Sequence, residues 1–161
     1  MSDNFNLPIF PLNGTILFPE TNLPLNIFEQ RYLNMVDFAL STNKKFGMIQ
    51  SKENGGLYNI GCIGKIISYE ETSDGRYLIN ILGEKYFEVL NEKKIKNLFR
   101  TVEARGFIPD KPLKKTQINE QTKHSLIQKY INFVKSSKYE IDFNFLEKIE
   151  PLALIKFIAM A

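Results

Sequence analysis

The most constraining feature of this sequence is a change of hydrophobic period near residue 28. Residues 5–28 hold four prolines among the short apolar runs "LPIFPL", "TILFP" and "LPLNIF". Proline cannot donate a hydrogen bond to a β-ladder, so these runs predict edge strands and strand ends. Over residues 28–45 apolar residues recur at helical spacing, which predicts one amphipathic helix with cations in its last turn.

The region after this helix predicts a β-sheet. The expected strands are "FGMIQ", "IGCIGKIISYEE", "YLINILG", "KYFEVLNEKK" and "NLFRTVEARGFI". Asp74-Gly75 indicates a tight hairpin turn between the second and third of them. Both faces of "YLINILG" are apolar, so this strand is expected to be central. Consecutive hairpins with frequent glycines favour a small closed or half-closed barrel.

The C-terminal third is helical in pattern. We expect a barrel subdomain over residues 1–109, a linker over 110–116 with mixed charge and proline, and a helical subdomain over 117–161. One helix carries an apolar stripe between Leu126 and Val134, with lysines expected on its other face. The last segment, "PLALIKFIAMA", is apolar nearly all round and must be buried from several sides, which predicts self-association through this helix, most simply as a symmetric dimer.

Composition excludes several classes of protein. The formal net charge is +3, and its excess lies beyond residue 109, so the first part is neutral and does not favour a dedicated nucleic-acid surface. The lone cysteine, Cys62, is expected to be buried and structural. There is no apolar run of membrane-helix length and no basic, apolar leader, so we expect a cytoplasmic protein without membrane contact. Without a Walker loop, clustered metal ligands or a nucleophile motif, we expect no enzyme, no catalytic residue, no cofactor and no metal.

A charged corner lies in "LPLNIFEQRYLNMV", where extended chain becomes helix. Glu29 is expected at the helix start, where the unpaired N–H groups favour a carboxylate. Arg31 can reach back to that acid, and Tyr32 is expected to face the core with Phe28 and Val36. We interpret Glu29, Arg31 and Tyr32 as a structural corner rather than a ligand site. On that interpretation Arg31→Ala lowers the melting temperature by several degrees, because it breaks a partly buried pair.

The same region carries a resemblance to a known family. "LPIFPLNGTILFPETNLPLNIFEQRYLNM" resembles the opening of the Lon protease N-terminal (substrate-binding) domain family, and the likeness continues through "IGCIGKI" and "DGRYLINILG" into the helices. The chain departs from the family pattern at Glu20, Gln30 and Tyr86-Phe87, where the family usually has Gly, Pro and Arg-Phe. The resemblance implies an α+β fold, namely a PUA-like small β-barrel with one early helix, followed by a C-terminal helical bundle that is incomplete in this chain.

The resemblance also implies a function of recognition. A stand-alone bacterial member, or the excised N-terminal domain of an ATP-dependent protease, would bind exposed apolar segments of unfolded or degradation-tagged polypeptides. The residues expected to make that contact are Leu57 and Tyr58, an apolar pair just past the glycine-rich "ENGG" turn. The alternative is that Tyr58 simply begins the next strand.

RNA binding is the alternative function, because PUA-like barrels elsewhere bind RNA. The stretch "NEKKIKNLFRTVEAR" sets cations beside an aromatic residue, as in a stacking platform with phosphate contacts. Glu92 and Glu103 dilute this patch, and a solvated hairpin is the commoner meaning of such a run. The candidate residues are Lys93, Lys94, Lys96, Phe99, Arg100 and Arg105.

Overall fold

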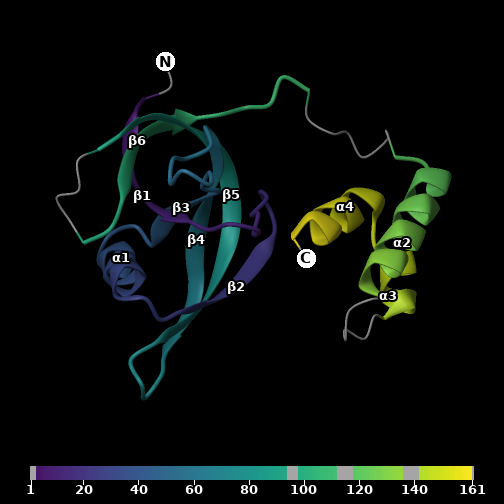
Figure 1. Cartoon of the computed structure of the whole chain (residues 1–161), viewed down its shortest axis with the longest axis horizontal. Coiled ribbons are helices and arrows are strands. Elements are labelled where there is room, and N and C mark those ends of the chain that lie inside the picture. The colour runs from purple at the N-terminus through teal and green to yellow at the C-terminus, as the bar shows by residue number, and fades with distance from the viewer. Residues whose placement is uncertain (1–2, 94–97, 112–117, 136–141, 161) are drawn as a thin grey trace. The chain divides into compact units, whose positions relative to one another are not determined.

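The computed structural model describes residues 3–93, 98–111, 118–135 and 142–160. The chain divides into two compact units, Met1–Ile108 and Pro109–Ala161. The described residues form six strands and four helices (Figure 1), which confirms the α+β class predicted from the sequence. Most of the expected linker, residues 112–116, lies outside the described residues. None of the helices in the described part of the chain is long and apolar enough to cross a membrane.

The first unit is a barrel-like sheet. Its elements are β1 (Phe5–Pro11), β2 (Asn22–Ile27), α1 (Gln30–Ser41), β3 (Lys45–Ile49), β4 (Ile60–Glu71), β5 (Tyr77–Glu92) and β6 (Thr101–Gly106). The strands pair in the order β2-β5-β4-β3-β1-β6, and β5 pairs with β6 as well, so five strands close a ring and β2 is attached at its edge. The β1–β3 pair is parallel and the other pairs are antiparallel.

Strand β5 differs from the prediction in length and agrees with it in position. The two strands expected over residues 77–94 are one strand of 16 residues, which pairs with β2 along its first half and with β6 along its second. Its three neighbours confirm that it is central. The turn before it is also as predicted, because Gly75 has a φ of 79° and its N–H donates to the carbonyl of Thr72 at 2.9 Å. The β4–β5 hairpin extends well beyond the ring (Figure 1).

The prolines do not all mark edges. Pro24 lies in β2, which is an edge strand as expected. Pro8 lies in β1, which has a partner on each side, so the expectation of an edge was wrong there. The register of β1 with β3 begins only at Ile9, so Pro8 needs no hydrogen-bond donor on that side.

The interior of the ring is built around Phe87 of β5, which is fully buried. Its neighbours come from all the other ring strands and are Leu7, Ile9, Ile49, Ile63, Val102 and Ala104. Two glycines make room for the ring of Phe87. A Cβ on Gly61 would lie 2.5 Å from Phe87 Cζ and 2.5 Å from the Met48 carbonyl oxygen, and one on Gly47 would lie 2.7 Å from Phe87 Cζ. The phenyl ring therefore occupies the volume that two side chains would need.

A second core lies between α1 and the sheet. Helix α1 packs beside β1 and β3 and buries Tyr32, Met35, Val36 and Ala39. The helix is shorter than predicted and has no basic residue in its last turn, since the expected cations follow the helix. Phe28 is exposed and not in the core, because the chain is still extended at Glu29, where φ is −74° and ψ is 132°.

The second unit comprises α2 (Glu120–Val134), α3 (Phe143–Lys148) and α4 (Pro151–Met160). Its core consists of Ile127, Ile131, Leu146 and Leu154. Asn119 and Asp142 cap the first two helices through their side chains. The expectation that lysines occupy the outer face of α2 was wrong for Lys123, which is buried and donates from Nζ to the Glu147 carbonyl at 2.6 Å. This bond satisfies a carbonyl near the end of α3.

The packing of Phe87 predicts the effect of enlarging Gly61. In Gly61→Ala the new methyl group overlaps a backbone oxygen and an aromatic ring, so the strands must shift, at a cost of about 1–3 kcal/mol in the free energy of unfolding. Gly106→Ala is the matched control, because a Cβ at Gly106 in β6 meets nothing within 4 Å. Urea unfolding of both variants measures the difference. Equal stability of the two variants would contradict this account of the ring interior.

Self-association through α4 stays a prediction. Leu154 is fully buried, but Ile155 and Ile158 are only half-buried and line a groove of about 630 Å³ together with Leu126 of α2. If a second copy covers this face, sedimentation equilibrium gives a mass that rises with concentration, and Ile158→Glu returns the chain to a monomer. Ala153→Glu, at an exposed position of the same helix, should leave the association unchanged. A monomer at every concentration would refute the prediction.

Candidate functional site

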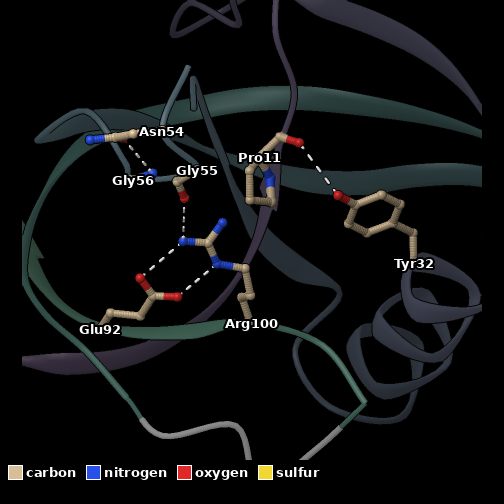
Figure 2. A network of polar contacts seen from close by, with 7 residues as sticks. All are labelled: Pro11, Tyr32, Asn54, Gly55, Gly56, Glu92 and Arg100. Carbon is tan, nitrogen blue, oxygen red and sulfur yellow. Dashed lines mark hydrogen bonds and ion pairs between the residues drawn. The ribbon is translucent and has the colours of Figure 1, made fainter. Parts of the chain in front are cut away.

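The glycine-rich segment between β3 and β4 forms a small ordered loop, residues 51–58. The Lys52 N–H donates to the Gly56 carbonyl at 2.7 Å, and the Gly55 N–H donates back to the Lys52 carbonyl at 2.9 Å. Gly55 has a φ of 80°, a conformation that side-chain-bearing residues rarely adopt. The Asn54 side chain accepts from the Gly56 N–H at 2.9 Å (Figure 2), so the turn is fixed by its own backbone and side chains.

The two residues predicted to contact polypeptide lie at the end of this loop. Leu57 is half-buried, pairs with Ser51 in an isolated bridge and packs against the core around Phe87. Tyr58 is 53% exposed, and Lys52 Nζ lies 5.6 Å from the centre of its ring. Tyr58 precedes β4 by two residues, so it does not begin the next strand. Leu57 therefore anchors the loop, while Tyr58 presents an aromatic face to solvent.

An arginine ties this loop to the place where the ring closes (Figure 2). Arg100 donates from Nε and Nη2 to the two carboxylate oxygens of Glu92, at 2.7 and 2.9 Å. The same Nη2 donates to the Gly55 carbonyl at 3.3 Å. The Arg100 side chain is 25% exposed, so this two-bond ion pair is partly shielded from water. The guanidinium group of Arg100 thus joins the loop to a part of the chain about 45 residues further on.

The corner at the start of α1 forms as expected but is more exposed than expected. Glu29 is the N-cap residue, yet its carboxylate caps no N–H group and pairs instead with Arg31, whose Nη2 lies 2.9 Å away. The two side chains are 47% and 58% exposed, and such pairs contribute only about 0–1 kcal/mol. The expectation of a partly buried pair was wrong. The structure therefore gives no reason to expect that Arg31→Ala lowers the melting temperature by several degrees.

Tyr32 belongs to the core, as the sequence predicted. Its ring lies 4.1 Å from that of Phe10, and its hydroxyl donates to the Pro11 carbonyl at 3.4 Å (Figure 2). The Arg31 guanidinium carbon lies 4.6 Å from the centre of the Tyr32 ring. Burial raises the pKa of Tyr32, and the charge of Arg31 opposes that rise only in part. The hydroxyl therefore remains a donor at neutral pH.

In the folded chain, several residues of the cationic patch proposed to bind RNA are buried or paired with acidic side chains. Phe99 is buried and packs against Phe38 at 5.4 Å between ring centres, so it was wrong as a stacking residue. Arg100 is paired with Glu92, and Arg105 with Glu88 at 2.7 Å. Lys93 is exposed, while Lys94 and Lys96 lie outside the described residues. The described members of the patch thus offer one cation, Lys93, without an acidic partner in the described chain.

Sequence reasoning missed the link from Arg100 and Glu92 to the loop. In the sequence both residues belong to one charged run. Only the tertiary structure brings Gly55 close to them. Cys62 is buried, as predicted. In the ranges that the structure describes, no three His, Cys, Asp or Glu side chains come together as a metal site would require.

A barrel-like sheet with one packed helix, followed by a second unit of helices, defines the chain as a small α+β protein and does not by itself specify a function. Residues 6–161 match the family model described as the ATP-dependent protease La (LON) substrate-binding domain. The chain belongs to that family, which confirms the resemblance seen in the sequence.

Relatives by sequence are whole proteases. The chain is 27% identical over 162 residues to the Lon protease of Dictyoglomus thermophilum, with 95% of this chain and 20% of that protein covered. It is 26% identical over 161 residues to the Lon protease of Heliobacterium modesticaldum, with 96% and 18% covered. The chain thus spans about a fifth of the length of the curated relatives that it matches.

Two solved structures share the fold. The Lon N-terminal domain protein from Xanthomonas campestris superposes with a TM-score of 0.59 at 19% identity, covering 96% of each chain. The N-terminal domain of a Lon protease from the Mycobacterium avium complex gives a TM-score of 0.65 at 15% identity, covering 98% of this chain and 83% of that one.

The junction at Arg100 predicts a loss of loop order in Arg100→Gln. This variant removes the charged partner of Glu92 and the donor to Gly55, so unfolding should cost about 1–2 kcal/mol less than in the wild type. The Gly55 and Gly56 amide protons should also exchange faster with solvent. The matched control is Arg105→Gln, which breaks an ion pair between the same two strands without touching the loop. Equal exchange in both variants would contradict the role of Arg100.

The same pair makes a prediction about pH. Hydrogen bonds from Arg100 lower the pKa of Glu92 below its ordinary value of 4.5, and they outweigh the rise caused by burial. A carboxyl group whose pKa is lowered by folding stabilises the fold above its unfolded pKa, and this contribution is lost as the pH falls through the folded pKa. The difference in unfolding free energy between wild type and Glu92→Gln should therefore shrink below about pH 4.5. A constant difference would refute the pairing.

Proposed function

We propose that this chain is a non-enzymatic recognition module that binds exposed apolar segments of unfolded or degradation-tagged polypeptides. Membership of the substrate-binding domain family supports the role, and the ordered, outward-facing Tyr58 on the 51–58 loop supports the place. Its partners are polypeptides, as in substrate selection by Lon-type proteases. Its setting is the cytoplasm, since a sequence with one cysteine suits a reducing compartment.

The loop has the physical properties that such a contact needs. Tyrosine offers a large amphipathic surface with few rotatable bonds, so little conformational entropy is lost when it binds. The cation of Lys52 over the ring restricts its orientation further. Arg100 donates to the Gly55 carbonyl and Leu57 packs against the core, so the ring is presented by a backbone that is already ordered before binding.

Removing the ring of Tyr58 tests the proposal. Tyr58→Ala should weaken binding of fluorescently labelled, unfolded casein about tenfold, the loss expected for one well-placed aromatic contact. Tyr69→Ala is the matched control, because Tyr69 is 55% exposed but lies on the β4–β5 hairpin. Fluorescence anisotropy measures both affinities. No binding by the wild type would refute the function, and an equal loss in both variants would refute the site.

A further inference from the structure

A small cavity lies in the first unit, close to the 51–58 loop. It has a volume of about 200 Å³ and is enclosed by residues 15–17, 48–50 and 60–62 together with Tyr86. These residues come from the segment before β2 and from strands β3, β4 and β5. None of the candidate site residues inferred from the sequence lines it, so the cavity is a feature that only the folded chain reveals.

The cavity has an apolar floor and an accessible rim. Leu17, Met48 and Cys62 are buried and form part of its wall. Ile16 and Ile60 are each 38% exposed, so the cavity opens to solvent between two apolar side chains. An occupant that leaves water for this space would gain contact with apolar atoms on most sides.

Two polar side chains in the cavity wall are free to bind. The Tyr86 hydroxyl and the Gln50 side-chain amide make no hydrogen bond to any residue that the structure describes. Burial raises the pKa of Tyr86, so its hydroxyl is protonated at neutral pH and can donate. A polypeptide backbone at the rim would supply carbonyl and N–H groups as hydrogen-bond partners for these two side chains.

The cavity and Tyr58 are close to each other, because residues of the cavity wall are bonded to Tyr58 or follow it closely in the sequence. The Tyr58 N–H donates to the Gln50 carbonyl at 3.1 Å, which joins the end of the loop to the cavity wall. Ile60, at the rim, follows Tyr58 by two residues. A segment of extended polypeptide that touches Tyr58 therefore passes close to the opening.

The volume of the cavity indicates the size of the group that it can bind. Pockets for cofactors and drug-sized ligands are usually about 300–1,000 Å³, which is larger than this cavity. An apolar cavity of about 150 Å³ is known to take up benzene. We propose that the cavity binds one aromatic side chain of the recognised polypeptide, with phenylalanine as the best fit. This inference rests on the proposed function and narrows its substrate to segments that carry such a side chain.

Two peptides test the inference directly. One is a short, unstructured peptide of small and polar residues with a single Phe, and the other has Ala in its place. The wild type should bind the Phe peptide at least about tenfold more tightly, as expected when one aromatic side chain is buried. With methyl-labelled methionine, the NMR signal of Met48 should shift on addition of the Phe peptide and stay fixed with the Ala peptide.

Substitutions around the cavity test whether the preference for the Phe peptide arises there. Ile16→Trp fills the opening and should abolish the preference for the Phe peptide, while Ile67→Trp, at an exposed position of β4, should keep it. Tyr86→Phe, which removes only the hydroxyl, should weaken binding about threefold. Equal affinity of the wild type for both peptides, with unfolded casein still bound, overturns the cavity and leaves the recognition role standing. Failure to bind casein overturns both, and an unchanged preference in Ile16→Trp overturns the cavity alone.

Discussion

The packing of Phe87 against Gly47 and Gly61 is the constraint on which the rest of the first unit depends. The phenyl ring in the centre of the five-stranded ring occupies the space that a side chain would need at two positions, Gly47 and Gly61, so both must be glycine. Strand β5 pairs with β2 along its first half and with β6 along its second, while it remains paired with β4 as far as Glu88, and this double pairing closes the sheet. The interior is thus filled by one large side chain and a layer of small and branched ones.

Closure of the ring creates the candidate site. At the end of β5 the Glu92 carboxylate pairs with Arg100, which directly precedes β6, and Nη2 of Arg100 also donates to the Gly55 carbonyl. The loop that carries Tyr58 is therefore fixed by strand pairing elsewhere in the sheet. The cavity near this loop also depends on the tertiary fold, since its walls come from strands β3, β4 and β5, from residues 15–17 and from Gln50. The contacts around β5 that stabilise the sheet thus also position the loop proposed for recognition.

Pairing of charges across strands also explains why the basic run near residue 100 is not a cationic surface in its described part. The register of β5 with β6 sets Glu88 against Arg105, and Glu92 lies within reach of Arg100. Phe99, which precedes β6, is buried and packs against Phe38 of α1. Among the described members of this cluster, Arg100 and Arg105 are therefore neutralised by acidic partners, and Phe99 is buried.

The sequence by itself determined the local elements: the helical period of α1, the bounds of β4, the Asp74-Gly75 turn, the burial of Tyr32 and Cys62, and the family. The helical period, the strand and the turn depend on neighbours within a few residues, so pattern is enough to predict them, and the family follows from a motif that continues along most of the chain. Only the tertiary structure decided that residues 77–92 form one strand, that Pro8 lies within the ring, that Phe28 is exposed and that Arg100 holds Gly55. Each of these depends on a partner from a distant part of the chain, which local periodicity does not encode.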